Sequence, residues 1–381
     1  MRKILLLLAA VMISLCLPAQ NITRLVDVKR VSESFRTLPI CSPRTDMMSV
    51  KAQADKPAKA PAGDVETFYL EYYDRVYGFE NLCVRSHVKS DFIFGNDGKV
   101  YIPNMFFMSQ LPGYIEGTLS GNTITVSGAH NAGTVGENTY YVSQVDPETG
   151  SPKNEAFTLT KDPATGIWKT DGNTLLGLYV DELIPENLYS YCAMLNYLPA
   201  GAFPASVQCR LTAVDNYDRN ISKTLEVIKV EDGYYIKGLM RGYDDSWVVG
   251  LYGENGDIKI PSYQVLGDDV AAVFVDELNY NQPEGLFVYD AEADTHSLQD
   301  NISLMDMYSD NGTDFYATQV YARMTISGLS ADISDVKADR KIVGTEYFDL
   351  SGRRVSDAYK GLIIRVTRYA DGTSSAEKIM K

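Results

Sequence analysis

The sequence predicts an all-β protein, and three observations support this prediction. The 381 residues include 26 Tyr and 29 Gly, which is typical of many short strands joined by tight turns. Two stretches repeat the same order of apolar pairs and turn residues at a spacing of about 130 residues, which marks a duplicated unit. Neither stretch carries the apolar periodicity of a long helix. We therefore expect two tandem antiparallel β-meander modules, each a flattened barrel or sandwich, followed by a small C-terminal β-sandwich-like domain.

Residues 1–19 are expected to form a signal peptide. Arg2-Lys3 gives a basic start, Ile4–Leu15 an apolar run, and Leu17-Pro18-Ala19 a small-residue cleavage site. The apolar run is too short to span a bilayer core of about 30 Å. Lipidation of Cys16 stays open as an alternative. We expect a mature chain that has no transmembrane helix and that lies outside the cell or on the outer-membrane surface.

Changes in composition and turn residues divide the rest of the chain. A flexible N-terminal segment, residues 20–64, ends in a stretch rich in Ala, Pro and Lys that has no periodic apolar face. The expected segments after it are a first β-module (65–186), a connector (187–205), a second β-module (206–318), a linker (319–341) and a C-terminal domain (342–381). The connector departs from strand alternation and contains Pro199 and Pro204, so we expect an irregular segment with a helical turn around Leu188–Leu195.

The internal similarity is clearest between residues 97–126 and 232–260. Apolar pairs, strand glycines and turns recur in the same order: Tyr101-Ile102 with Tyr235-Ile236, Tyr114-Ile115 with Trp247-Val248, Gly117 with Gly250, and Gly121-Asn122 with Gly256-Asp257. A glycine inside a strand marks a bulge, a bend or a close approach of another chain segment. We therefore expect Gly117 and Gly250 to mark a bend at matching places in the two copies, where each small sheet curls over its core.

Charge and cysteine content exclude several kinds of partner. The formal net charge of −15 disfavours nucleic acid and anionic lipid. No CxxC pair is present, and the three histidines do not stand at the spacing of zinc ligands. Cys192 and Cys209 flank a loop, so they form either a disulfide in an oxidising compartment or two buried free thiols.

No catalytic motif is found in a suitable context. Cys83 and His87 are four residues apart in an expected strand, which separates them by about 13 Å, too far to share a proton. We interpret them as a core cysteine and a surface histidine. Acidic pairs in loops such as Asp244-Asp245 leave a carboxylate-dependent hydrolase open. Calcium also stays open at two oxygen-rich loops, which lack the full ligand pattern: Asp215, Asp218 and Asn220, and Asp310, Asn311 and Asp314.

Binding is the function that the sequence favours. Tyr and Trp side chains on a sheet can stack on sugar rings or anchor a protein interface. The candidate ligand contacts are Trp247, Tyr243, Tyr114 and Trp168, each of which is also a candidate for cross-strand packing. We expect a non-catalytic binding or adhesion protein that needs no cofactor and takes a glycan or protein ligand. The alternatives are a glycosidase-like hydrolase and a purely structural surface protein.

The end of the chain carries an ordered set of short elements: YFDLSGRRV at Tyr347–Val355, KGLIIRV at Lys360–Val366, ADG at Ala370–Gly372, and KIMK at the terminus. This set resembles the C-terminal sorting domain of type IX secretion system cargo. The resemblance implies a small β-sandwich that is read by outer-membrane secretion machinery. It covers the last 45 or so residues, where the ~11-residue Arg365–Ser375 stretch departs from the pattern. The two modules are also similar to tandem β-modules of uncharacterised secreted and surface proteins.

Overall fold

The structure is a computed structural model that describes most of the chain from residue 60 onward. The described residues are 60–76, 79, 82–103, 111, 113–267, 269–276, 282–309, 313–329, 342–349, 353–356, 359–360, 362–369 and 374–380. The signal peptide and nearly all of the flexible segment predicted above therefore lie outside the described residues. The chain forms two compact units, Met1–Ser327 and Gly328–Lys381.

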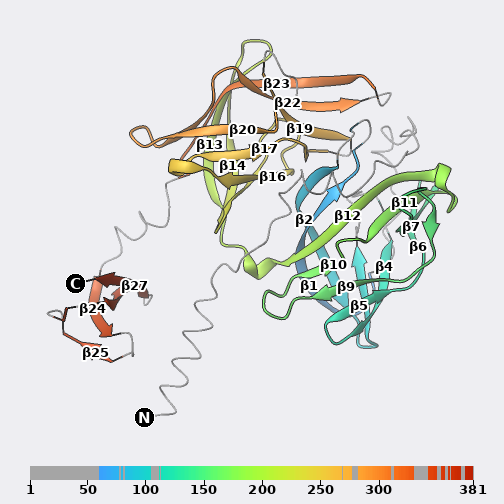
Figure 1. Ribbon diagram of the computed structural model, residues 1–381, viewed down its shortest axis with the longest axis horizontal. Coiled ribbons are helices and arrows are strands. Elements are labelled where there is room, and N and C mark those ends of the chain that lie inside the picture. The colour runs from blue at the N-terminus through green and yellow to red at the C-terminus, as the bar shows by residue number, and fades with distance from the viewer. Residues whose placement is uncertain are drawn as a thin grey trace. The chain divides into compact units, whose positions relative to one another are not determined.

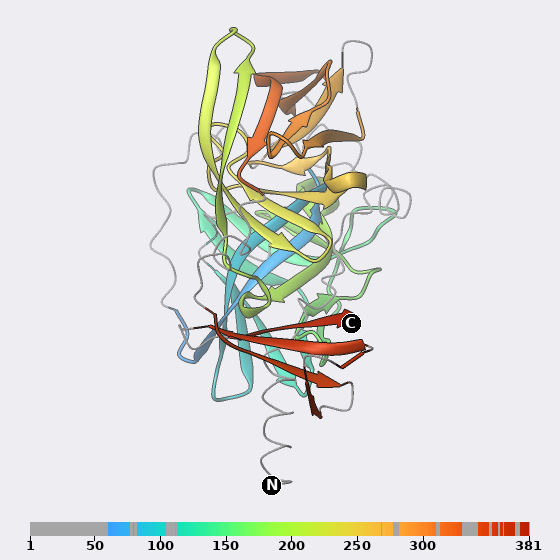
Figure 2. The ribbon, with the colours of Figure 1, turned by 90° about the vertical axis from the view of Figure 1, so that its left-hand side faces the viewer.

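The first unit contains two repeats, which are coloured blue to green and yellow to orange in Figures 1 and 2. The first repeat (residues 64–199) has the strands β1 (Asp64–Asp74), β2 (Cys83–Phe94), β3 (Lys99–Pro103), β4 (Tyr114–Ser120), β5 (Thr123–Val126), β6 (His130–Val135), β7 (Asn138–Val145), β8 (Pro152–Lys153), β9 (Phe157–Lys161), β10 (Trp168–Thr170), β11 (Leu175–Val180) and β12 (Leu188–Pro199). Two short 3-10 helices, η1 (Pro185–Asn187) and η2 (Ala200–Ala202), flank β12.

The second repeat (residues 207–327) follows directly. Its elements are β13 (Val207–Asp215), β14 (Asn220–Val230), β15 (Gly233–Lys237), β16 (Trp247–Tyr252), the 3-10 helix η3 (Glu254–Gly256), β17 (Ile258–Pro261), β18 (Gln264–Val265), β19 (Val270–Asp276), β20 (Glu284–Asp290), β21 (Thr295–Leu298), β22 (Ile302–Ser309) and β23 (Phe315–Ser327). Within the described residues helical structure is confined to these 3-10 turns, so the all-β prediction is confirmed.

Both repeats pair their strands along the same path. In the first repeat the antiparallel order is β1-β2-β3-β4-β5-β9-β10-β12, and the β1–β12 ladder closes a ring. In the second repeat the order is β13-β14-β15-β16-β17-β20-β21-β23, closed by the β13–β23 ladder. The chain leaves each ring after β5 or β17 to form side strands on β12 or β23. Each ring is therefore a meander that the side strands interrupt. The side strands also pair with strand edges that would otherwise stay open.

The strand glycines predicted to share a purpose have the same surroundings. A Cβ atom on Gly117 would lie 2.5 Å from Ile124 Cγ2, and one on Gly250 would lie 2.8 Å from Ile258 Cγ2. Both isoleucines are fully buried on the next strand of their ring. The two glycines therefore share one role, which is to leave room for a buried isoleucine side chain rather than to place the expected bend.

A bulge with an unusual backbone is repeated as well. The β1–β12 register shifts opposite Tyr72, and the β13–β23 register shifts opposite Ala213. The bulged strands place Met194 at φ 55° and Arg323 at φ 49°, a region that side chains other than glycine rarely adopt. Two copies of one strained bulge at matching places support duplication more strongly than matching strand lengths do.

Two predicted linking segments are partly strands, so their assignment was wrong. Leu188–Pro199, within the expected connector, is β12, the strand that closes the first ring. The expected helical turn at Leu188–Leu195 is therefore absent. The prolines flank this strand and do not interrupt it, because Pro185 opens η1 and Pro199 ends β12. In the same way β23 extends to Ser327, into the segment expected to be a linker.

The two repeats join through β2, which makes all their strands one 23-stranded sheet. β2 pairs antiparallel with β16 at Ser86 and Trp247, and parallel with β18 at Val84 and Gln264. One apolar cluster packs Val76, Phe79 and Cys83 against side chains of β18 and β19. A second packs Leu198 and Phe203 against side chains of β14, β15 and β16. The repeats are thus joined by main-chain pairing and by shared core.

The C-terminal unit is a single antiparallel sheet. Its strands are β24 (Ile342–Asp349), β25 (Arg354–Val355), β26 (Leu362–Tyr369) and β27 (Ser374–Met380), in the order β25-β24-β26-β27. Glu346 lies 3.2 Å from the Arg354 guanidinium and 2.8 Å from that of Arg368, which links three strands on one face. Each strand overlaps one of the sequence elements YFDLSGRRV, KGLIIRV and KIMK named above. The described residues form one sheet, so the β-sandwich-like arrangement expected for this domain is not seen in them.

Candidate functional site

A cavity of about 430 Å³ lies between the two repeats, within the usual size range of small-molecule sites. We call it the inter-repeat cavity. The first repeat lines it with Tyr69, Arg85, Ser86, His87, Val88 and Lys89. The second repeat lines it with Glu226, Lys237, Asp245, Ser246, Trp247 and Val265. Because both repeats supply its walls, this cavity exists only in the joined pair.

A β-bulge in β2 supplies two of the lining residues. Leu70 pairs with Val88 and Tyr72 pairs with Arg85, so Ser86 and His87 together stand opposite one residue of β1. His87 takes φ 56°, the left-handed region that is costly for a residue with a Cβ atom. The bulge sets the His87 side chain against the second repeat, away from the orientation that regular alternation would give it.

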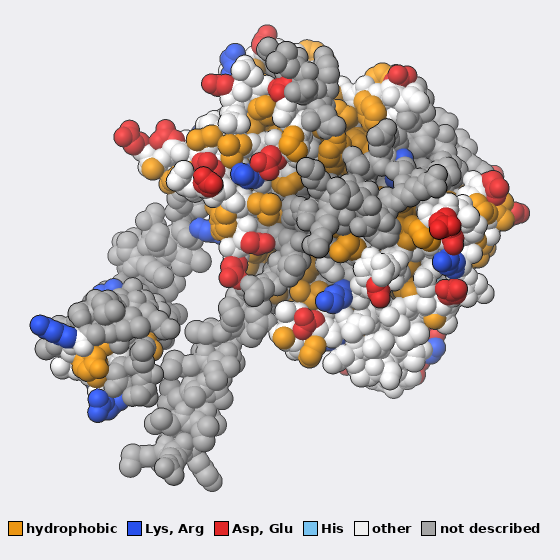
Figure 3. All heavy atoms as spheres, viewed as in Figure 1, with side chains coloured by type: hydrophobic (Ala, Val, Ile, Leu, Met, Phe, Trp, Pro, Cys, Tyr) orange, Lys and Arg blue, Asp and Glu red, His pale blue; other side chains and the backbone are white. Residues whose placement is uncertain are grey.

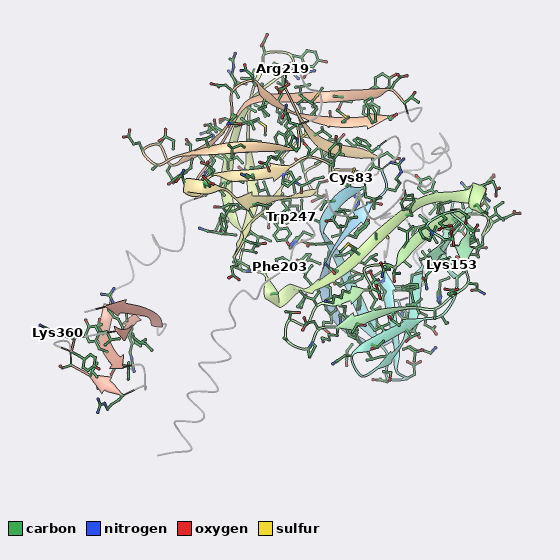
Figure 4. All side chains as sticks on the ribbon, in the orientation of Figure 1. Cys83, Lys153, Phe203, Arg219, Trp247 and Lys360 are labelled. Atoms are coloured by element: carbon green, nitrogen blue, oxygen red, sulfur yellow. The ribbon has the colours of Figure 1, made fainter. Side chains whose placement is uncertain are left out.

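Aromatic rings surround His87 on several sides. Its ring stacks on Tyr69 at 3.8 Å between centroids with an interplanar angle of 9°. The rings of Trp247, Phe203 and Tyr235 lie 4.4, 4.6 and 5.1 Å away. Figure 4 shows Trp247 and Phe203 at the boundary between the repeats. Tyr69 and Trp247 are half-buried, so each keeps part of its ring accessible.

His87 is a neutral imidazole at neutral pH. Burial lowers its pKa to about 3, and the nearby Lys237 ammonium contributes in the same direction. Its Nδ1 atom is buried without a hydrogen-bond partner, and so is the Oγ atom of Ser86. Both residues are only 4% exposed. A buried polar atom without a partner costs about 1–3 kcal/mol, so two of them side by side in one cavity wall require an explanation.

Each charged side chain that lines the cavity lies close to a group of opposite charge. Lys237 Nζ lies 3.1 Å from Asp245 and 3.9 Å from Glu226. Arg85 Nε donates to Asp74 at 3.0 Å, and its Nη2 donates to the carbonyl of Gly267 at 3.1 Å. Lys89 pairs with Asp91 at 2.9 Å. On the face drawn in Figure 3, acidic and basic side chains likewise lie interspersed with hydrophobic ones.

A buried hydrogen bond connects the two repeats next to the Ser86–His87 bulge. The Tyr235 hydroxyl, on β15, donates to Glu71 Oε1, on β1, and both residues are almost fully buried. Glu71 is the residue that faces the Ser86–His87 bulge across the β1–β2 ladder. The bulge is therefore held from the first repeat by its ladder and from the second repeat through this tyrosine.

The structure separates the four aromatic residues predicted as ligand contacts. Trp247 lines the inter-repeat cavity. Trp168 is 2% exposed in the core of the first repeat. Tyr243 donates to Asp306 at 3.3 Å, and burial together with that carboxylate raises its pKa to about 12. Tyr114 stands opposite Pro103 at the start of β4. Only Trp247 of the four belongs to the cavity lining.

Of the cavity residues, the sequence analysis named Trp247 as a ligand contact and Asp245 as one of several loop carboxylates, and it predicted none of the others as part of a site. His87 was expected on the surface, which is wrong, because the bulge and the covering second repeat bury it. Cys83 is buried as expected, and burial, reinforced by Asp74, raises the pKa of its thiol. The thiol therefore stays protonated and is a poor nucleophile. The clearest signal of the site in the sequence is Trp247 at a repeated apolar position.

The remaining candidate chemistry is accounted for by local contacts. Asp215, in one oxygen-rich loop, accepts from Arg219 Nε at 2.7 Å and from the backbone N–H groups of Tyr217 and Arg219. Among the described residues no group of His, Cys, Asp and Glu side chains is arranged to hold a metal ion. Asp310 and Asn311 lie outside those residues. Cys192 and Cys209 are buried and no disulfide joins them, so the disulfide alternative is not realised.

A search of the described part of the chain finds no helix with the length and apolarity that crossing a membrane requires. Comparisons with protein-family models, with curated proteins and with solved structures find no match to this chain.

Proposed function

We propose that this protein is an exported, non-catalytic binding protein whose ligand occupies the inter-repeat cavity. One observation carries the proposal: Ser86 and His87, which line a cavity together with Tyr69 and Trp247, each have a buried polar atom without a hydrogen-bond partner. Structural residues in a core normally satisfy their polar atoms. A ligand that hydrogen-bonds to these atoms and packs on the rings removes both penalties at once.

The charge pattern favours binding over catalysis. Lys237 lies within ion-pair distance of both acidic residues that line the cavity, Glu226 and Asp245. A glycosidase needs one carboxyl group to hold a proton while another stays ionised, in two different environments. Here both carboxylates face the same ammonium group. Asp245 is also fully solvent-exposed, which suits a rim residue and does not suit a buried acid.

The proposal includes the architecture and the address of the protein. The two repeats are, on this view, copies of one flattened-barrel module, which their matching rings and bulges support. The N-terminal leader directs export. The C-terminal unit acts as a sorting domain of the type IX kind, which places the binding repeats on the outer-membrane surface or outside the cell. Support for the sorting domain comes from the order of its sequence elements and from strands at the expected places.

A binding panel tests the function. The full chain is exposed to an array of neutral and acidic glycans and to immobilised extracellular host proteins, with assays for glycan and peptide hydrolysis in parallel. Trp247→Ala is expected to weaken any binding at least tenfold, or about 1.4 kcal/mol. Tyr217→Ala is the matched control, because Tyr217 is an aromatic residue that is 68% exposed and does not line the cavity.

Three outcomes would decide against the proposal. Binding that survives Trp247→Ala undiminished would move the site away from the cavity. Turnover of a glycan or peptide that Glu226→Gln or Asp245→Asn abolishes would establish the hydrolase alternative. A lack of binding to every member of the panel would favour the purely structural role. Melting curves of each variant separate loss of the site from loss of the fold.

A further inference from the structure

The inter-repeat cavity has features that select among ligand classes, and the inference drawn from them rests on the proposed function. We propose that the ligand is a neutral saccharide, with one pyranose ring packed against Trp247 and Tyr69 and its hydroxyl groups bonded at the Ser86–His87 bulge. The argument has three steps: charge, hydrogen bonding and shape.

Charge excludes strongly ionic ligands. Every charged residue that lines the cavity has an ion-pair partner. Lys237 pairs with both Glu226 and Asp245, while Arg85 pairs with Asp74 and Lys89 with Asp91. An anionic or cationic ligand would have to break one of these pairs or enter beside a group of its own sign. Of these pairs Arg85–Asp74 is buried, so a ligand that broke it would leave a poorly solvated charge, which opposes binding. A neutral polar ligand meets no such opposition.

Hydrogen bonding requires a ligand rich in donors and acceptors. The buried atoms without a partner are an imidazole nitrogen, His87 Nδ1, and a hydroxyl oxygen, Ser86 Oγ. A hydroxyl group can donate to either and can also accept from the serine, whereas a purely apolar ligand would leave both costs in place. Several hydroxyls on one small ring match two polar atoms that come from adjacent residues of one strand.

Shape requires a ligand with an apolar face as well. The His87 ring covers one face of Tyr69, and the parts of the half-buried Tyr69 and Trp247 rings that stay accessible come from the two opposite repeats. A pyranose ring has C–H bonds on its flat faces and hydroxyls around its edge, so its face can pack on an aromatic ring while its edge reaches polar atoms. A cavity of about 430 Å³ is large enough for one or two such rings.

Tryptophan fluorescence offers a direct test, because the chain has only two tryptophans. The full-length Trp168→Phe variant keeps Trp247 as its single tryptophan. It is titrated with methyl glycosides of glucose, galactose, mannose and N-acetylglucosamine, with their linear trisaccharides, with glucuronic and sialic acids, and with short capped peptides. We expect at least one neutral saccharide to change the Trp247 emission in a saturable way.

Two further variants separate a ligand contact from a structural role. His87→Phe keeps an aromatic ring but removes Nδ1, and Ser86→Ala removes Oγ. Each should weaken saccharide binding about tenfold, while the melting temperature falls little or rises. Saccharide affinity equal to that of the wild type in both variants would overturn the assignment of the bulge as the hydroxyl-binding wall.

The outcomes distinguish this inference from the proposed function. Saturation of the Trp247 signal by acidic sugars or peptides alone would overturn the neutral-saccharide inference and leave the cavity as the binding site. No response to any saccharide at about 10 mM, well above a Kd of 1 mM, would also overturn the inference. The proposed function itself fails if binding to the wider panel is also absent or does not depend on Trp247, or if the protein turns over a glycan or peptide through Glu226 or Asp245.

Discussion

The two repeats follow one pairing path, yet only β2 of the first carries a bulge at the place that faces the other repeat. In the first repeat Ser86 and His87 stand together opposite Glu71. The matching β13–β14 ladder runs from the Val207–Val227 pair to the Val214–Asn220 pair without a shift in register. The strand pairing that the repeats share sets the fold, and the bulge in which they differ lies at the cavity. The second repeat thus supplies the second wall of the cavity, and the bulge contributes Ser86 and His87 to the lining.

The equivalent positions Tyr114 and Trp247 illustrate the same difference. Both open the fourth strand of their ring and are half-buried. Trp247 pairs with Ser86 across the repeats, whereas Tyr114 pairs with Pro103 inside its own ring. One sequence position therefore has two environments, and only the junction between repeats gives it a cavity to line.

The largest effect is expected from the buried tryptophan. Trp168→Ala should destabilise the protein by about 3–5 kcal/mol, because it empties a large core site. Trp247→Ala should cost clearly less, because its ring is already partly exposed beside the cavity. Urea unfolding followed by circular dichroism measures both. Equal losses would mean that Trp247 is a core residue and that the contrast between the two tryptophans is wrong.

The repeated glycines should respond alike. Gly117→Ala and Gly250→Ala each force a methyl group against a buried isoleucine, which should cost about 1–3 kcal/mol. Gly172→Ala is the control, since a Cβ atom there meets nothing within 4 Å. Chemical denaturation of the three variants checks the prediction. A marked loss at one strand glycine and none at the other would break the equivalence of the two rings.

Much of this architecture could be predicted from the sequence, because its signals lie within short segments of the chain. Strand alternation, turn residues and the pair Gly117 and Gly250 are properties of short segments, so they are visible without the partner strand. β12 was missed because the nearby prolines suggested an irregular segment, although they only flank the strand. The Ser86–His87 bulge was invisible because a bulge is a relation between two strands. Only the pairing with β1 reveals it.

The hydrogen bond between the repeats gives a smaller and more specific test. Tyr235→Phe removes the hydroxyl that donates to buried Glu71, and the loss should be about 1–3 kcal/mol. Tyr252→Phe removes a hydroxyl that donates to the Val230 carbonyl within one repeat at a 37% exposed side chain, so it should cost less. Thermal unfolding ranks the two. The reverse order would argue that the junction contributes little to stability.

Lowering the pH should reveal how much the neutral His87 side chain contributes to the stability of the fold. Its pKa in the folded protein is about 3, below the ordinary value of 6.5, so the unfolded chain binds a proton first as pH falls. Stability from this residue is complete above pH 6.5 and declines as pH drops toward 3, by about 1 kcal/mol between pH 7 and pH 5.5. His87→Phe should lose less stability than the wild type over that range. Parallel pH profiles for the two proteins would contradict the buried neutral imidazole.

The most direct test of the central claim is to measure stability and affinity together in Ser86→Ala. If the Ser86 hydroxyl is kept without a partner for a ligand, its removal relieves a buried polar atom and leaves the backbone bulge in place. The account predicts a free energy of unfolding equal to or higher than that of the wild type, together with affinity about tenfold weaker for whichever ligand depends on Trp247. A clear loss of stability with unchanged affinity would contradict it, because the hydroxyl would then serve the fold and not the site.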